Sequence, residues 1–124
     1  MKVIQTQKAP AAVGPYSQAI EVNGLIFTSG QLPIIPESGE LIYDDIKKAT
    51  ARSLENIKEI LQEAGSSLDK VVKVNIFLKD MNDFSSVNEV YSEYFTTNKP
   101  ARSCVEVSKL PKDGIIEIEA VAEK

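Results

Sequence analysis

The chain contains no histidine, no tryptophan and a single cysteine among its 124 residues. Without histidine it cannot form a Ser-His-Asp triad, a Cys-His dyad or a histidine-based zinc or iron site. The lone Cys104 cannot make an internal disulfide, and no secretory signal is recognisable, so a reducing cytoplasm is the expected location. Any chemistry must therefore use carboxylates, hydroxyls, backbone groups or water, and no spacing of residues indicates a metal site.

Arginine is scarce as well. Of the 14 basic residues only Arg52 and Arg102 carry a guanidinium, so a planar, bidentate anion clamp has just two candidates. The net charge of −4 opposes contact with a phosphate backbone. No apolar run approaches the roughly 18 residues of a membrane span. We therefore expect neither a nucleic acid nor a membrane as a partner.

The composition that is present fits an ordinary globular domain. Hydrophobic residues make up 43% and charged residues 26% of the chain, and the length suits one domain rather than two. A domain of this size buries roughly two-thirds of the surface of its unfolded chain, which is enough for a core without cross-links. We predict a single domain over residues 1–124.

Turn residues predict a β-hairpin in the first quarter of the chain. Apolar residues from Gln18 to Ser29 flank Asn23-Gly24, a dipeptide that tolerates the positive φ angles of a type I′ turn. Two prolines and a glycine between Pro33 and Gly39 then indicate a loop. A short strand is predicted just before it, over residues 31–34.

Two helical patterns follow. After Asp44-Asp45, apolar residues recur at three- and four-residue steps until Gly65, which predicts an amphipathic helix of about five turns. A second pattern begins at Asn82-Asp83 and ends before Pro100. Because each helix separates strands that are too distant for a hairpin, both should lie on the same face of one sheet.

Three further strands are predicted, over residues 71–78, 101–108 and 115–123. The expected fold is α+β, a two-layer sandwich of a mixed sheet with two helices on one face. In the last strand, one set of alternating residues suits the helix side: Ile116, Ile118, Ala120 and Ala122. The other set, together with Val71 and Phe77, forms an uncovered face: Ile115, Glu117, Glu119 and Val121.

The uncovered face mixes large apolar side chains with carboxylates. It is too apolar for bulk water and too charged for a core, so a second copy of the chain should cover it. We therefore predict a homo-oligomer.

Several residues could carry chemistry, each beside a structural alternative. Arg102 could clamp a carboxylate or form a surface ion pair, and Arg52 fits a solvated helix face. Glu117 and Glu119 lie on one strand face, with roughly 6 to 7 Å between their Cα atoms. They could act as acid and base or be solvated. Cys104 has no histidine to activate it and suits a structural role.

Five blocks in order resemble the RidA (YjgF) family of enamine/imine deaminases. The match extends over about residues 9–122, and its most specific part is the Pro-Ala-Arg-Ser block that begins at Pro100. The blocks are Gly-Pro-Tyr-Ser-Gln from Gly14, Thr-Ser-Gly-Gln from Thr28, Val-Asn-Glu-Val-Tyr from Val87, the block from Pro100 to Val107, and Ile-Glu-Ile-Glu-Ala from Ile116.

The resemblance implies a chorismate-mutase-like homotrimer with clefts between subunits. It implies hydrolysis, without a cofactor, of 2-iminobutanoate and 2-iminopropanoate from PLP-dependent dehydratases to 2-oxo acids and ammonia. By motif position Arg102 would bind the substrate carboxylate, and Glu117 would position the attacking water. Other positions would line the cleft: Tyr16, Ser29, Gly30, Asn88 and Cys104.

One alternative of a different class remains open. The chain could bind small carboxylates or a regulatory partner in the same cleft without catalysis. A ribonuclease is disfavoured by the acidic balance and the absence of histidine, and a chorismate mutase would share only the fold. The sequence also leaves open whether Glu117 or Glu119 faces Arg102.

Overall fold

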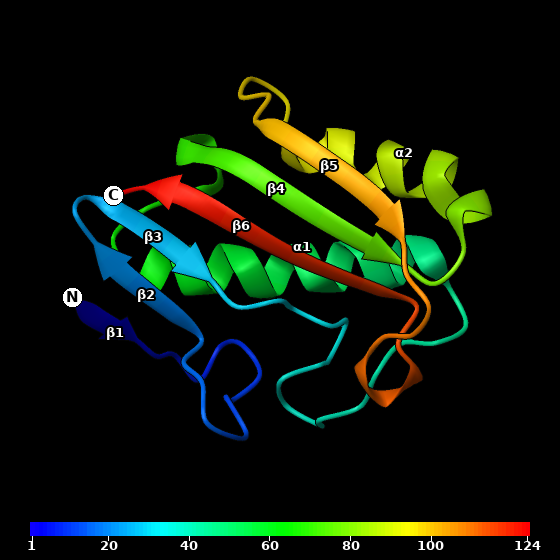
Figure 1. Cartoon of the computed structure of the whole chain (residues 1–124), viewed down its shortest axis with the longest axis horizontal. Helices are drawn as coiled ribbons and strands as arrows, with labels where there is room; N and C mark the ends of the chain where they lie inside the picture. The colour runs from blue at the N-terminus through cyan, green and yellow to red at the C-terminus, as the bar shows by residue number, and fades with distance from the viewer.

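Six strands form one mixed sheet in the computed structural model, which describes residues 1–124. The strand order is β1-β2-β3-β6-β4-β5, and β4 and β5 form the one parallel pair. Both helices pack on the same face of the sheet (Figure 1), which confirms the predicted α+β sandwich. The elements in chain order are β1 (Lys2–Ile4), β2 (Ala19–Val22), β3 (Leu25–Thr28), α1 (Ile46–Glu63), β4 (Val71–Leu78), α2 (Phe84–Tyr94), β5 (Ala101–Glu106) and β6 (Ile116–Glu123).

Local sequence signals explain where most elements begin and end. Asn23 (φ 52°) and Gly24 (φ 77°) form the turn between β2 and β3, which confirms the predicted hairpin. The Asp45 carboxylate accepts from the backbone N–H groups of Lys47 and Lys48 at the start of α1, and this satisfies donors that no helical carbonyl can reach. Gly65 (φ 81°) follows the helix end.

The start of α2 differs in detail from the prediction. A 3₁₀ turn over Met81–Asp83 precedes α2, and the cap is Asp80, whose carboxylate accepts from Asn82 N at 2.9 Å. Asp83 makes no side-chain capping bond. The sequence does not predict strand β1, because three residues carry too little alternation to be recognised.

The core lies between the helices and the covered face of the sheet. Its large side chains are fully buried, and each contributes about 1.5–3 kcal/mol of hydrophobic stabilisation. They include Ile26, Leu54, Ile57, Ile60, Leu61, Val74, Ile76, Val87, Ile116 and Ile118. Neither α1 nor α2 combines the length and the apolar character that a membrane-spanning helix needs.

A β-bulge near the start of β4 places the first residues of that strand on the opposite sheet faces from those that the sequence predicts. Val71 pairs with Ala122 and Lys73 with Val121, so one residue is inserted between them. The insertion reverses the alternation. Val71 is therefore buried at 2% exposure, although the alternation predicts it on the uncovered face, and Val72 is 41% exposed.

Three smaller predictions are also wrong. The strand over residues 31–34 is reduced to isolated bridges, Gln31 with Ile118 and Ile34 with Leu41. Ile115 precedes β6 and packs against the core rather than on the uncovered face. Strand β5 ends at Glu106, two residues earlier than expected.

Candidate functional site

The residues predicted to form the site fall into two groups in one chain. One group, which we call the Glu117 half-site, lines a cavity of about 500 Å³ and consists of Tyr16, Ser29, Gly30 and Glu117. The other group, which we call the Arg102 half-site, lies where β5 faces α2 and consists of Asn88, Arg102 and Cys104.

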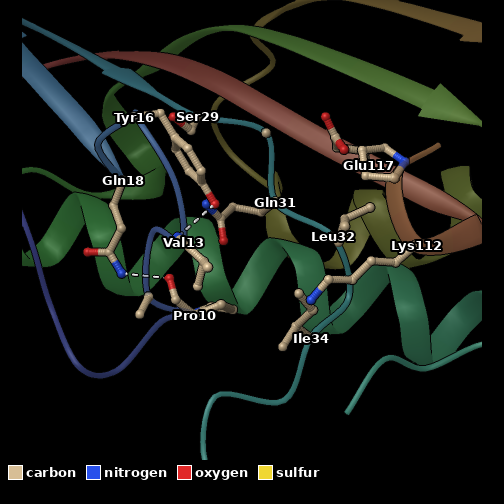
Figure 2. Close-up of a pocket in the computed structure, with 13 residues that line it drawn as sticks. Pro10, Val13, Tyr16, Gln18, Ser29, Gln31, Leu32, Ile34, Lys112 and Glu117 are labelled. Carbon is tan, nitrogen blue, oxygen red and sulfur yellow. Dashed lines mark hydrogen bonds between the residues drawn. The ribbon is translucent and has the colours of Figure 1, made fainter. Parts of the chain in front are cut away.

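Loops enclose the cavity of the Glu117 half-site. Its walls come from the segment before β2, the loop after β3 and the turn before β6. Figure 2 shows Tyr16 and Gln18 on one side of the cavity and Ile34 and Lys112 on the other. Glu117 is the one carboxylate that lines it.

The Glu117 carboxyl lies directly against Gly30. A methyl group added at Gly30 would lie 2.7 Å from the Glu117 Cδ atom, so only glycine leaves room for this position of the carboxyl. Burial raises the Glu117 pKa above its ordinary value, and the charge of Glu119 raises it further. The group therefore accepts a proton more readily than an exposed glutamate does.

Hydrogen bonds fix the neighbours of Glu117. The Ser29 hydroxyl donates to the Ser17 carbonyl, so its own oxygen lone pairs remain free to accept from a ligand N–H group. The buried Gln18 amide accepts from Thr6 N at 2.7 Å and donates to Pro10 O at 2.8 Å. It thereby attaches the N-terminal segment to the hairpin, although no pattern in the sequence points to this role.

Tyr16 and Glu119 are placed differently from Glu117. The Tyr16 ring is exposed beside the cavity, and its hydroxyl accepts weakly from Val13 N at 3.4 Å. Glu119 accepts from Asn75 Nδ2 at 3.1 Å and does not line the cavity. Of the two carboxylates, Glu117 is therefore the one available to a ligand in this cavity.

Neutral groups hold the Arg102 guanidinium in the second half-site. Its Nη1 donates to Asn88 Oδ1 at 2.7 Å, and its Cζ lies 4.7 Å from the ring centroid of Tyr91 and 5.5 Å from that of Phe84. None of the ion pairs in the structure involves Arg102, so the alternative of a surface ion pair is wrong. The guanidinium is fixed by cation–π and amide contacts without being neutralised.

A smaller cleft of about 380 Å³ opens beside Arg102 and is also lined by Lys99 and Tyr91. Cys104 follows two residues later on β5 and is half-buried. Burial raises the Cys104 pKa, and the nearby Arg102 charge offsets only part of that rise. The thiol is therefore a weak nucleophile at neutral pH.

The two half-sites do not meet within one chain. Arg102 pairs with Val74 on the helix side of the sheet, whereas Glu117 pairs with Phe77 on the opposite face. Strand β4 also lies between β5 and β6. Arg102 is not among the charges that shift the Glu117 pKa. A single cleft that contains both residues is therefore absent from the isolated chain.

Arg52 also differs from the sequence expectation of a solvated helix residue. Its Nε and Nη2 both donate to the buried Asn56 Oδ1, at 3.2 and 2.9 Å. Neither residue lines a cavity with Glu117 or Arg102. No three Cys, Asp or Glu side chains are grouped so that they could hold a metal ion.

Comparisons with known proteins agree with this fold over the whole chain. A RutC family protein of Pyrococcus abyssi is 62% identical, with 99% of this chain and 97% of that protein covered. An Escherichia coli protein named "Putative reactive intermediate deaminase TdcF" is 46% identical, with coverages of 98% and 95%. The crystal structure of E. coli TdcF with bound serine superposes with a TM-score of 0.96 at 44% identity, covering 100% of this chain and 99% of that one.

The family model described as Endoribonuclease L-PSP matches residues 6–124. This range contains all five of the blocks that carry the resemblance, since the first of them begins at Gly14. The resemblance inferred from those blocks is confirmed, and the chain belongs to the Endoribonuclease L-PSP family, which is also called the YjgF/RidA/RutC family.

Proposed function

We propose that this protein hydrolyses 2-imino acids, in particular 2-iminobutanoate and 2-iminopropanoate, to 2-oxo acids and ammonia. The observation that carries the proposal is the state of Arg102, which is held by Asn88 and two aromatic rings and has no carboxylate partner. A guanidinium in this state has further N–H donors for bidentate binding of a substrate carboxylate. The name given to the relative TdcF supports the same class of reaction.

In the proposed reaction Arg102 binds and orients, and Glu117 moves protons. Glu117 takes a proton from water as the water oxygen bonds to the carbon of the protonated imine, and the C=N electron pair moves to nitrogen to give a neutral carbinolamine. Glu117 then gives that proton to the amine nitrogen. The hydroxyl proton passes back to Glu117 as the C=O bond forms and the C–N bond breaks, so that ammonia leaves. The reaction consumes one water and changes no oxidation state, and such acid–base assistance typically contributes about 10² to 10⁴ in rate.

We propose that the complete site forms between subunits of a homotrimer. The two half-sites lie on opposite faces of one chain, so a neighbouring copy must supply the missing half. The uncovered sheet face supports this assembly, because Phe27 and Val105 are exposed on the same face that carries Glu117 and Glu119. Burying this face in an oligomer would also dry the site and strengthen its electrostatic contacts.

The alternative is binding of small carboxylates without turnover. The TdcF crystal structure contains bound serine, which is a small carboxylate, and this favours keeping the alternative as an outcome of the test. A nuclease activity, as the family description names, is disfavoured by the net charge of −4 and the absence of histidine.

Turnover of a freshly generated imine tests the proposal. An amino-acid oxidase acting on L-2-aminobutyrate supplies the imine, and semicarbazide traps whatever remains unhydrolysed. We expect the protein to accelerate 2-oxo acid formation and to lower the yield of trapped imine. If the protein binds the 2-oxo acid in a titration but leaves the trapped yield unchanged, the alternative is correct and the proposed activity is wrong.

A further inference from the structure

The loop after β3 is attached to helix α1 by one buried amide. Asn56 is fully buried, and its Nδ2 donates to the carbonyls of Ile34 at 3.0 Å and Leu32 at 3.4 Å. These partners precede Asn56 by 22 and 24 residues, so the contact is a long-range tie. The loop then closes on itself through the Ile34–Leu41 bridge.

Arg52 fixes the direction of that amide. Two Arg52 nitrogens, Nε and Nη2, donate to Asn56 Oδ1, and a guanidinium has no acceptor that could face the amide nitrogen instead. The amide oxygen must therefore face Arg52, and the amide nitrogen must face the loop. Arg52 and Asn56 act as one unit, which we call the Arg52–Asn56 clamp.

The two residues whose carbonyls the clamp holds also form a wall of the cavity. The side chains of Leu32 and Ile34 line the same cavity as Glu117 (Figure 2). Leu32 is confined from a second side, because a methyl group added at Gly114 would lie 3.0 Å from Leu32 Cδ2. The wall is apolar, and its position depends on the clamp and on this close packing.

We propose that the Arg52–Asn56 clamp sets the side-chain specificity of the enzyme by fixing Leu32 and Ile34 as the wall against which the side chain of a 2-imino acid packs. This inference rests on the proposed function. A fixed apolar wall discriminates by size, and one methylene group in such a pocket is worth about 10- to 200-fold in kcat/KM. Neither clamp residue touches substrate, so both are positioning residues.

The test compares two imines made by the same oxidase, one with an ethyl side chain from L-2-aminobutyrate and one with an isobutyl side chain from L-leucine. We expect wild type to prefer the ethyl imine. In Asn56→Ala the ratio of the two kcat/KM values should fall roughly tenfold, while kcat for the ethyl imine stays nearly unchanged. Arg52→Lys keeps the positive charge but loses the planar pair of N–H donors to Asn56, so it should lower the ratio by less than Asn56→Ala does.

A matched control separates specificity from loss of stability. Val87→Ala opens a cavity under α2 and removes none of the hydrogen bonds that hold the loop to Asn56. This variant should destabilise the protein without changing the ratio. Hydrogen exchange adds a measurement that needs no activity: the amides of Ile35 and Ile42, which bond within the loop, should exchange faster in Asn56→Ala and Arg52→Lys but not in Val87→Ala.

The outcomes distinguish the two proposals. If wild type hydrolyses both imines but does not discriminate, or if the clamp variants keep the wild-type ratio, the specificity inference is wrong and the proposed function stands. If wild type hydrolyses neither imine, both are wrong. If Asn56→Ala does not fold, the ratio measured for Arg52→Lys decides the question, because this variant leaves Asn56 in place.

Discussion

Glu117 lies in a cavity built from loops, whereas Arg102 projects from the edge strand β5 against helix α2. Burial in this cavity raises the Glu117 pKa, and the like charge of Glu119 raises it further. Arg102 is held by an amide and two rings that leave its charge unopposed. In the proposed mechanism Glu117 is the proton acceptor and Arg102 binds the substrate carboxylate. Because the two side chains lie on opposite faces of the sheet, the proposal brings them together only between subunits.

Removing the carboxylate should have the largest effect. In Glu117→Gln the side chain keeps its shape but cannot take a proton from water, so kcat for imine hydrolysis should fall by about 10² to 10⁴. Glu119→Gln is the matched control and should retain most of the rate, because Glu119 bonds to Asn75 outside the cavity. A large loss in the control and none in Glu117→Gln would reverse the two roles.

Removing the guanidinium should lower kcat less than removing the carboxylate does, and it should weaken substrate binding more. Arg102→Ala should lower kcat/KM about 100-fold through lost orientation of the substrate, and Arg102→Lys should recover only part of it, because an ammonium lacks the planar fork. Circular dichroism should show a folded protein, since Arg102 is outside the core. Near-normal kinetics in Arg102→Ala would show that another group binds the carboxylate.

Mixing the two inactive variants tests directly whether the half-sites join across subunits. Arg102→Ala and Glu117→Gln, refolded together in equal amounts, should regain about a quarter of wild-type activity, because a quarter of the interfaces pair two intact halves. Each variant refolded alone is the control. No recovery from verified mixed oligomers would mean that each site is built within one chain.

The smallest expected effect is on pH dependence. Glu117 must be ionised to act as a base, and its pKa is raised, so kcat/KM should fall on the acid side with a midpoint above that of an ordinary glutamate. Glu119→Gln removes the second cause of the rise, and the acid limb should move to lower pH. Glu123→Gln, at the exposed end of β6, should leave the profile in place, and an equal shift there would argue against a local effect.

Local chemistry makes much of the fold predictable. The Asn23-Gly24 turn and the Asp45 cap depend on neighbours within three residues, and such signals are visible in the sequence. The bulge at Val72 is not visible there, because alternation does not reveal which strand carries an extra residue.

The sequence predicts the candidate site as a set of residues but not as an arrangement. The sequence blocks propose Arg102 and Glu117 as site residues, yet the placement of these residues on opposite faces depends on pairing with β4. Asn56 escapes prediction because its partners lie in an irregular loop 22 and 24 residues earlier. Long-range contacts of this kind produce no periodic pattern in the sequence.

The loop that the Arg52–Asn56 clamp anchors has a practical use in protein engineering. Its base is pinned at Leu32 and Ile34, while residues 37–40 at its tip are exposed and include Gly39 in a left-handed conformation (φ 76°). A peptide epitope grafted at Ser38 would project from this tip without displacing the anchored residues. The same scaffold could then display a foreign sequence once per copy of the chain while its interior stays as it is.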